Sequence, residues 1–550
     1  MLLVLIILKY LLFLVIGAYL LRLFYVTISN FSEVFVFLHR KEMAVVLWVF
    51  IFAFGSLLLY QAYWQLFIGN AYFFATRKLH DPRPWIIEAT TIKGTIYDRN
   101  HDDSKVLAGY TDATKGELPR RYYPLGEATS HLIGYSDVER DKSGMEKHYF
   151  DRLMGRTRSS AAEEDNFINN KYFRVQSVGN DIALTIDYEL QKTAYEAFGA
   201  NKGAVVAIAP ATGDVLVLVS APSFHPDSVS VDAAWARIVA DEDGKRLYNR
   251  ALKGRYPPGS TFKVIVAAAA TELGISPVWT LDGRGYRPPG VRRKRVHDHE
   301  RHSYAERGQR WRGQGQIDLT RALVKSSNAY FAHLGVVVGD SMLHAVAGRF
   351  GFNQAVQWNT SRPEFLKSII TMRSSFPETP TAHELAWSSI GQEKVLATPL
   401  QLAMIAAAIA NDGVLMKPRL ELDEPPEEWN RVVSAEAAAK VRKMMREVVW
   451  ARGGTAWRMR MQEVEVGGKT GTAEINQVVK QDDGTSAVEI VNNAVFISFA
   501  PVENPKIAIA VIAEGAGYGG AAAAPVAKQI YLKAHELGYF NDSTDESKKQ

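Results

Sequence analysis

Apolar and polar positions divide the chain into a hydrophobic N-terminal end and a longer part of mixed polarity. Residues 43–76 form a stretch of 34 residues without a charged side chain, and the first 18 of them are almost continuously apolar. A helix of about 20 such residues is long enough to cross a bilayer, whereas a buried core helix rarely needs so long an uncharged run. We therefore predict a transmembrane helix over residues 43–69.

A second apolar run, 10–21, lies upstream of this helix, and Lys9 and Arg22 are the only charged residues among the first 32. This pattern predicts a second membrane span. A cleaved signal peptide fits less well, because the segment lacks a basic n-region and a small-residue cleavage site before the next span. We expect residues 1–42 to hold this first hydrophobic segment and a loop that joins it to the next helix.

Basic residues indicate the orientation of the two spans. The connecting loop contains His39, Arg40 and Lys41, so the positive-inside rule predicts that it is cytoplasmic and that the N-terminus and the C-terminal bulk lie outside. Translation from Met43 would leave a single span, and the large C-terminal part would still lie outside. The sequence therefore leaves one or two spans open, but either arrangement predicts that the large C-terminal part is external.

The pattern changes twice after the membrane segment. Residues 81–180 are mostly polar, mixed in charge and punctuated by Gly, Pro and Asp, which predicts an extended, partly β region. Apolar runs with helical or strand periodicity then predict a globular α/β domain over residues 181–540. Its expected helices are at 188–198, 262–273, 319–334 and 399–411, and its expected strands are at 203–209, 214–219, 494–499 and 506–514. The polar tail 541–550 is predicted to be disordered.

Composition narrows the chemistry. The 550 residues include no cysteine, which excludes disulfides, cysteine-ligated zinc, iron–sulfur clusters and cysteine nucleophiles. The 64 basic and 59 acidic residues give a net charge of only +5. So mild a charge does not point to a polyanionic partner, and we expect no nucleic-acid binding.

One serine–lysine pair has the spacing of a nucleophile and its base. Ser260 opens an alanine-rich predicted helix, and it is the only serine with a lysine, Lys263, three residues later. This spacing puts both side chains on one helix face, and a buried amine loses proton affinity and can act as a base. Free N–H groups at a helix start also stabilise negative charge. An N-cap serine with an incidental lysine fits the same residues, so the pair alone leaves both interpretations open.

Two further short motifs follow in the chain. Ser326-Ser-Asn328 is the only Ser-x-Asn in the sequence, and Lys469-Thr470-Gly471-Thr472 begins a predicted strand, in which glycine allows a substrate to approach the backbone. A similar Lys-Ser-Gly at Lys142 precedes the nucleophile and is interpreted as a turn. Each motif is weak alone, but their joint occurrence in this order indicates a serine acyl-transfer site.

The three motifs resemble those of penicillin-binding proteins and serine β-lactamases. From about Ile92 to the end, longer stretches resemble class B penicillin-binding proteins, the monofunctional peptidoglycan transpeptidases. These stretches are 93–100, 143–151, 185–191, 221–227, 249–251, 258–263, 389–392, 398–402 and 467–474. The resemblance implies an α/β (α+β) fold, with a transpeptidase domain built on a central antiparallel sheet over 181–540. It also implies a short pedestal or dimerisation-like domain over 70–180, after N-terminal transmembrane helices. The family usually has one span and often a longer pedestal, so this chain departs from it in both.

The resemblance also implies catalytic roles. Ser260 would attack the penultimate D-Ala carbonyl of a stem peptide ending in D-Ala-D-Ala, while Lys263 accepts its proton. Ser326 would pass a proton to the leaving amine. Asn328 would hold the peptide amide and the nearby lysine, and Lys469 would set the electrostatics around the second serine.

The remaining site residues would bind the substrate. Thr470, Gly471 and Thr472 are expected to line the position of its terminal carboxylate, and the backbone N–H groups of Ser260 and Thr472 to form the oxyanion hole. The resemblance implies inhibition by β-lactams and requires neither a cofactor nor a metal.

Other functions on the same fold fit the sequence less well. A class A β-lactamase needs a glutamate four residues before an asparagine, and no asparagine between Asn328 and Lys469 has one. A β-lactam sensor carries a His-Glu-x-x-His protease motif, which the chain lacks. The region between membrane and catalytic domain is too short for a glycosyltransferase, and an intact motif set argues against a vestigial scaffold. The alternative function is a β-lactam-binding sensor or hydrolase.

A basic insertion separates the first two motifs. Residues 284–312 contain ten Lys or Arg but only Asp298, Glu300 and Glu306 as acids. Such a run is either a solvated loop or a contact with anionic lipid headgroups or wall polymer. A metal site at His297, His299 and His302 stays open, although the absence of cysteine makes it the weaker reading and we predict no metal.

The resemblance implies a location and a partner as well. We expect the protein in the inner, cytoplasmic membrane with its catalytic domain on the outer, periplasmic side, beside a membrane glycosyltransferase of the SEDS type. The stretch 311–319 resembles a Gly-His-Gly segment of elongation-type members, with Gln314 in place of the histidine. This favours elongation over division and leaves both open.

Overall fold

The structure is a computed structural model that divides into two compact units, Met1–Ile87 and Glu88–Gln550. The residues described are 18–19, 22, 25–26, 41–63, 91–111, 120–137, 140–155, 179–292, 294–361, 369–379, 381–480 and 486–541.

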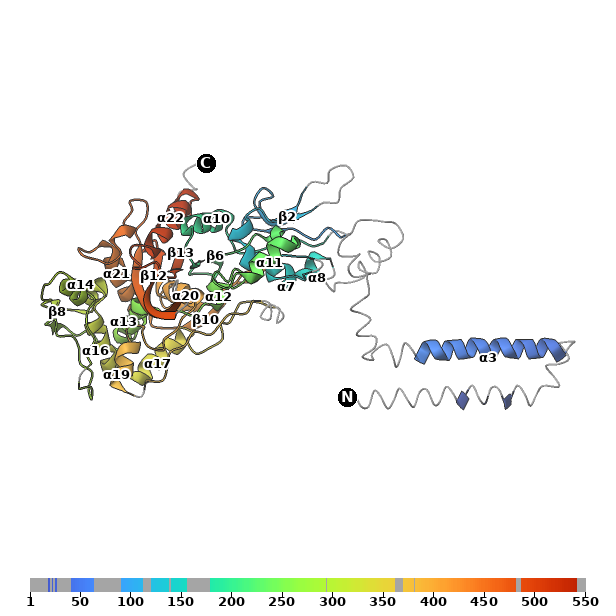
Figure 1. The fold of residues 1–550 in the computed structure, drawn as a ribbon, viewed down its shortest axis with the longest axis horizontal. Coiled ribbons are helices and arrows are strands. Elements are labelled where there is room, and N and C mark those ends of the chain that lie inside the picture. The colour runs from blue at the N-terminus through green and yellow to red at the C-terminus, as the bar shows by residue number, and fades with distance from the viewer. Residues whose placement is uncertain are drawn as a thin grey trace. The chain divides into compact units, whose positions relative to one another are not determined.

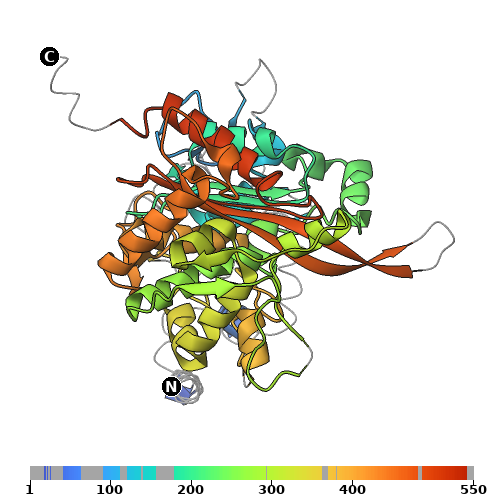
Figure 2. The same ribbon diagram turned by 90° about the vertical axis from the view of Figure 1, so that its left-hand side faces the viewer.

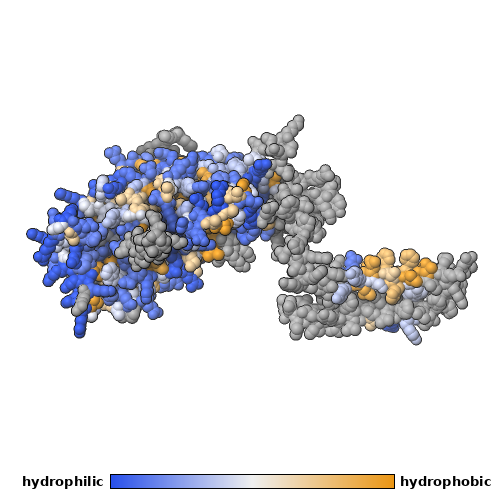
Figure 3. Space-filling model, in the orientation of Figure 1, coloured by the Kyte–Doolittle hydropathy of each residue, from blue (hydrophilic) through white to orange (hydrophobic). Residues whose placement is uncertain are grey.

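Helix α3 (Lys41–Tyr63) is the main described element of the first unit. Large apolar side chains are exposed along it, with Phe50 65% and Phe52 76% accessible, and Figure 3 shows them as an orange band. Among the residues described, no single helix is both long and apolar enough to count as a membrane span. The second predicted span, at 10–21, lies almost entirely outside the described residues, as does the end of the first beyond Tyr63.

A five-stranded sheet forms the centre of the second unit, in the order β11-β12-β13-β5-β6. Every neighbouring pair in it is antiparallel, and Figure 2 shows the ribbon of the two longest strands extending from the body of the domain. Its strands are β5 (Gly203–Ile208), β6 (Val215–Ala221), β11 (Gly467–Lys480), β12 (Ser486–Ala500) and β13 (Ile507–Ala513). The three strands β5, β6 and β13 are buried at every position, as their unbroken apolar sequences require when both sheet faces are covered. The predicted mixed α/β fold with a central antiparallel sheet is confirmed.

Helices cover both faces of this sheet (Figures 1 and 2). Helices α10 (Tyr188–Phe198) and α22 (Ala523–Glu536) pack on one face, while α20 (Pro399–Ala410) and α21 (Ala435–Trp450) pack on the other. All twelve residues of α20 are buried, which explains why its sequence has no polar stripe. Helix α13 (Lys263–Glu272) packs against α21 and carries its lysine into the interior.

The other elements of this domain are mostly short helices around the motifs. They are η3 (Pro226–Ser230), α11 (Asp232–Ala240), α12 (Arg250–Lys253), η4 (Gly259–Phe262), α14 (Glu300–Glu306), α15 (Leu319–Lys325), α16 (Asn328–Val338), α17 (Asp340–Arg349), α19 (Ala382–Ser388) and η5 (Trp457–Met459). Two ribbons complete it, β7 (Trp279–Leu281) with β8 (Gly315–Ile317) and β9 (Val414–Met416) with β10 (Glu428–Arg431).

The residues before this domain form a small sheet with short helices. The strand order is β3-β2-β1-β4, and the elements are β1 (Ile96–Tyr97), β2 (Val106–Tyr110), β3 (Arg121–Tyr122), η2 (Gly126–Ala128), α6 (Ser130–Ile133), α7 (Gly144–His148), α8 (Phe150–Leu153) and β4 (Ile182–Ala183). Apolar side chains such as Ile96, Leu107 and Met145 belong to the same core cluster as the large sheet. The region is therefore packed onto the domain that follows, and its limits at 70 and 180 stay a prediction.

Candidate active site

Ser260 lies in the 3₁₀ turn η4, immediately before α13, and not in the α-helix itself. Gly259 precedes it with φ +53°, and a Cβ there would lie 2.6 Å from the carbonyl oxygen of Thr472. From the other side, a Cβ on Gly391 would lie 2.1 Å from the carbonyl oxygen of Gly259. Only glycine allows these close approaches, so the serine turn is held between β11 and the loop 389–392.

Lys263 is completely buried, and its Nζ lies within 3.0 Å of three oxygen atoms. The distances are 3.0 Å to Ser260 Oγ, 2.7 Å to the Ser326 carbonyl oxygen and 2.7 Å to Asn328 Oδ1. A neutral amine has two N–H groups and one lone pair. This geometry therefore lets both N–H groups donate to the carbonyl and amide oxygens while the lone pair accepts the Ser260 hydroxyl proton.

Burial lowers the pKa of the Lys263 amine from 10.5 to about 7, because water that would solvate the ammonium is excluded. The carboxylates of Asp298 and Glu300 oppose the change by favouring the charged form. Half of the amines are consequently neutral near neutral pH, which is the condition for a general base that works there.

The second motif forms the junction between α15 and α16. Ser326 ends α15 in the left-handed conformation with φ +56°, which turns its hydroxyl toward the two lysines, at 3.5 Å from Lys263 Nζ and 2.8 Å from Lys469 Nζ. Ser327 is the N-cap of α16, since its Oγ accepts from the Tyr330 N–H. Asn328 then begins the helix with its side-chain oxygen on Lys263.

Lys469 projects from β11 and is also fully buried. Its Nζ donates to Ser326 Oγ at 2.8 Å and to the Thr470 carbonyl at 2.9 Å. Burial lowers the pKa of Lys469 well below its usual value, and repulsion from Lys263 lowers it further. The two amines therefore oppose each other's protonation across the Ser326 hydroxyl.

The three residues after Lys469 have different surroundings. Thr470 is buried, and its Oγ1 donates to Thr455 Oγ1 at 2.8 Å. A Cβ on Gly471 would meet the Pro258 carbonyl at 2.9 Å, so the missing side chain allows β11 to pack against the serine turn. The sequence interpretation assigned that space to substrate. Thr472 is partly exposed beside Gly259.

Asp298 is a buried residue of this cluster that the sequence interpretation considered only as a possible metal neighbour. Its Oδ1 accepts from Ser327 Oγ at 2.8 Å and from the Ala329 N–H at 2.9 Å. The adjacent His297 carbonyl accepts from Asn328 Nδ2 at 3.1 Å. The basic insertion thus holds the Ser-x-Asn loop. Asp298 is one of only three acids among the ten basic residues of 284–312, and this was the feature of the sequence that marked it.

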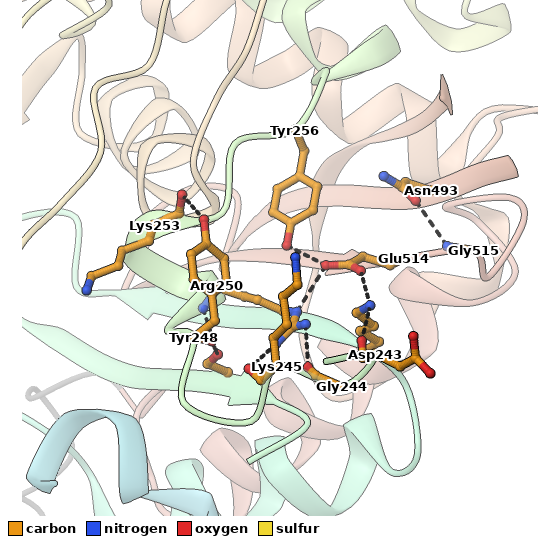
Figure 4. Close-up of polar contacts among 12 residues, drawn as sticks. Asp243, Gly244, Lys245, Tyr248, Arg250, Lys253, Tyr256, Asn493, Glu514 and Gly515 are labelled. Atoms are coloured by element: carbon orange, nitrogen blue, oxygen red, sulfur yellow. Dashed lines mark hydrogen bonds and ion pairs between the residues drawn. The ribbon is translucent and has the colours of Figure 1, made fainter. Parts of the chain in front are cut away.

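A second polar cluster fixes the segment that leads to Ser260 (Figure 4). Glu514, at the end of β13, accepts from Arg250 Nε at 3.1 Å and from Tyr256 Oη at 2.7 Å. Arg250 is almost completely buried and also donates to the carbonyls of Gly244 and Lys245. The ion pair ties the segment before the serine turn to the central sheet.

The three histidines of the insertion do not converge. His297 contacts Arg301, His302 pairs with Glu306 at 3.3 Å, and the His299 ring packs edge-on against Tyr518 at 5.4 Å. Within the described part of the chain, no group of three His, Asp or Glu side chains is placed to hold a metal ion.

Comparison with known proteins gives consistent matches. The profile of the penicillin binding protein transpeptidase domain matches residues 203–532. Peptidoglycan D,D-transpeptidase MrdA of Acinetobacter baumannii is 31% identical in an alignment 460 residues long, and the match covers 75% of this chain and 65% of that protein. Peptidoglycan D,D-transpeptidase PbpA of Mycolicibacterium smegmatis is 32% identical in an alignment 468 residues long, and the match covers 78% of this chain and 88% of the relative.

Solved structures agree with these matches. The imipenem acyl-enzyme complex of penicillin-binding protein A from M. tuberculosis superposes with a TM-score of 0.67 at 29% identity, over 81% of this chain and 99% of that one. PBP2 of Pseudomonas aeruginosa in complex with WCK 5153 gives 0.64 at 28% identity, over 83% and 96%.

Proposed function

The chain belongs to the penicillin-binding protein family of D,D-transpeptidases, and from this premise we propose that it cross-links peptidoglycan stem peptides through an acyl-enzyme on Ser260, as a membrane-anchored protein inhibited by β-lactams. The family that the motifs resemble is thereby confirmed. We further propose a role for each site residue, anchoring in the membrane and a membrane partner.

In the first step, Ser260 Oγ bonds to the penultimate D-Ala carbonyl carbon while Lys263 Nζ takes the hydroxyl proton. The 3.0 Å contact between these atoms and the lowered pKa of the amine support this pairing. The carbonyl oxygen becomes an oxyanion, for which the backbone N–H groups of Ser260 and Thr472 are proposed as donors. Removing one such donor elsewhere costs about 3 kcal/mol of transition-state stabilisation.

Collapse of the intermediate breaks the bond from carbon to nitrogen of the terminal D-Ala, whose amine must gain a proton. Ser326 Oγ is proposed to deliver it, because this hydroxyl lies between the two lysine amines. Lys469 keeps a positive field at the hydroxyl when charged and can replace its proton. Thr470 and Thr472 are proposed to bind the terminal carboxylate, with Gly471 between them keeping β11 close to the serine turn.

The amine of a second stem peptide then attacks the ester carbon. A new amide bond forms and the ester bond to Ser260 breaks. Lys263 returns the proton that it took in the first step to the serine oxygen, and the proton of the attacking amine passes through Ser326 Oγ to Lys469, which replaced the proton of Ser326 when the D-Ala left. No cofactor or metal takes part in these steps.

The observation that carries this proposal is the contact of Lys263 Nζ with Ser260 Oγ inside a buried cluster that also holds Ser326, Asn328 and Lys469. Mass spectrometry of the intact protein after exposure to penicillin tests it. We expect one adduct on the wild type and on Ser230→Ala, an exposed serine far from the cluster in sequence. Ser260→Ala should carry none, and a stable adduct on that variant would refute the nucleophile.

The time course of the same adduct separates the alternatives. A transpeptidase should lose the label slowly, whereas rapid turnover of penicillin would favour a β-lactam hydrolase. An adduct that forms and persists in a protein unable to cross-link stem peptides would favour a sensor.

Anchoring by the N-terminal segment is supported by the uncharged sequence 43–76 and by the exposed apolar side chains of α3. We propose that residues 43–69 cross the inner membrane, with the catalytic domain on the periplasmic side and one or two spans in total. Alkaline carbonate extraction of membranes should leave the full chain in the pellet. Release into the supernatant would contradict the anchor.

The proposed partner is a membrane glycosyltransferase of the SEDS type, in elongation more than in division. Co-purification from membranes, with crosslinking of the N-terminal segment, tests this partner. If the protein is recovered from membranes without a polytopic glycosyltransferase, the proposed partner is contradicted.

A further inference from the structure

A cavity of about 450 Å³ lies beside the serine–lysine cluster. It is lined by β7, the segment 282–287 that follows it, and α16, is open to the surface, and belongs to the region of the basic insertion. Figure 1 shows the neighbouring elements α14, β8 and α16 together in one part of the domain. Cavities of this size bind small ligands or segments of larger ones.

Aromatic rings form one wall of the cavity. The His333 ring of α16 stacks with Trp279 at 3.9 Å and with Tyr286 at 4.4 Å, with interplanar angles of 16° and 17°. Trp311 lines the cavity as well. These rings hold one another in place, so they offer flat, rigid apolar surfaces of the kind on which a sugar ring can lie with little loss of conformational entropy.

The charge in the cavity is positive. Arg284, Arg287 and Arg295 line it, against two carboxylates. Both carboxylates are already engaged, because Asp282 pairs with Arg284 and Asp298 accepts from the Ser-x-Asn loop. Among the residues described, Arg287 makes no ion pair and its side chain is exposed. A ligand with a carboxylate would therefore find an unneutralised guanidinium there.

The cavity shares residues with the catalytic motif. Asp298 and Ala329 both line it, and the Ala329 N–H donates to that carboxylate. Ala329 directly follows Asn328, whose side chain holds Lys263. A ligand in the cavity would therefore lie next to the Ser-x-Asn motif. Such a ligand is close enough to be another part of the substrate molecule whose peptide reacts at Ser260.

We propose that this cavity is a subsite for an anionic glycopeptide, in which a sugar of the substrate strand packs on the aromatic wall and a free carboxylate pairs with Arg287. The inference rests on the proposed function and extends it from the scissile bond to a more distant part of the substrate. It gives the basic insertion two roles, holding the catalytic loop through Asp298 and binding the strand.

Binding of a soluble disaccharide-pentapeptide to the full-length Ser260→Ala protein in detergent tests this subsite. On that background, Arg287→Gln should weaken binding about threefold, the usual size of a lost charge pair at an exposed site. Arg310→Gln removes an exposed arginine of the same insertion that does not line the cavity, and it should leave the affinity unchanged. The bare pentapeptide should bind the parent more weakly than the disaccharide-pentapeptide.

Equal affinities for Arg287→Gln and Arg310→Gln would overturn the subsite, and equal affinities for the two ligands would overturn its sugar contact. Vesicles containing anionic lipid provide the other source of negative charge. If Arg287→Gln reduces vesicle binding and leaves glycopeptide binding unchanged, the cavity faces lipid and the proposal fails. Labelled penicillin distinguishes failure of the proposed function from failure of the subsite. If the wild-type protein, with Ser260 intact, is not acylated, the proposed function is contradicted. If it is acylated normally but Arg287→Gln does not alter glycopeptide binding, only the subsite is contradicted.

Discussion

The lowered pKa of Lys263 predicts how the rate of acylation depends on pH. If this amine is the base, only its neutral form accepts the Ser260 proton, so the second-order rate constant for penicillin acylation follows the neutral fraction. With a pKa of about 7, that fraction is about one tenth at pH 6 and about nine tenths at pH 8. The rate constant should rise about tenfold over this range and level off above it.

An unperturbed amine would behave differently. At the ordinary value of 10.5, the neutral fraction would rise about a hundredfold between pH 6 and pH 8 and continue to rise beyond pH 9. The curvature near neutral pH therefore distinguishes a buried base from a solvated one. Because Lys469 is buried within the same cluster, the midpoint that is measured belongs to the coupled pair of amines.

Stopped-flow measurement with a fluorescent penicillin gives this profile between pH 5.5 and pH 9.5. The carboxylate of the reagent keeps its charge throughout, and intrinsic fluorescence at each pH checks that the protein stays folded. A log-linear increase to pH 9 or above, or a rate constant independent of pH, would refute the assignment of Lys263 as a base with a lowered pKa.

Three substitutions give further tests. Asp298→Asn removes a carboxylate that favours the charged form of Lys263, so the acylation midpoint should move to lower pH, and a move to higher pH would contradict the electrostatic argument. Glu514→Gln leaves buried Arg250 without an anion and should lower the free energy of unfolding by about 3 kcal/mol, as measured by chemical denaturation. No change would show that the backbone carbonyls that Arg250 contacts are enough to stabilise its charge. Gly391→Ala places a Cβ at φ +73° and 2.1 Å from the Gly259 carbonyl, so it should lower both the melting temperature and the acylation rate, whereas wild-type values for both would contradict close packing at the serine turn.

Local features of the sequence predicted individual elements well. The helix expected at 188–198 is α10, because Asp187 caps its start and Gly199 ends it. Helix α20 begins at a Thr398 N-cap followed by proline, and it ends one residue before the predicted limit. Strand lengths were predicted less well. The strand expected at 494–499 is β12, which begins at Ser486 because residues 486–493 also pair with β11, and the mixed polar and apolar sequence of these residues did not mark them as part of the strand.

Contacts between distant segments were beyond a reading of the sequence. The supporting role of Asp298 depends on two hydrogen bonds to residues about 30 positions away. Likewise Gly471 packs against the Pro258 carbonyl, which lies far from it in the sequence. Neither residue type nor periodicity carries that information, because it arises only when the insertion and β11 pack on the serine turn.

The sequence by itself determined which chemical groups are available and in what order, since Ser-x-x-Lys, Ser-x-Asn and Lys-Thr-Gly-Thr are local patterns of residue type. The tertiary structure decided that these groups meet, by bringing Ser326 to Lys263 and to Lys469 across 63 and 143 positions of the chain. It also decided their protonation, because the pKa of each lysine depends on the water that the surrounding sheet and helices exclude, and burial is a property of the packed domain.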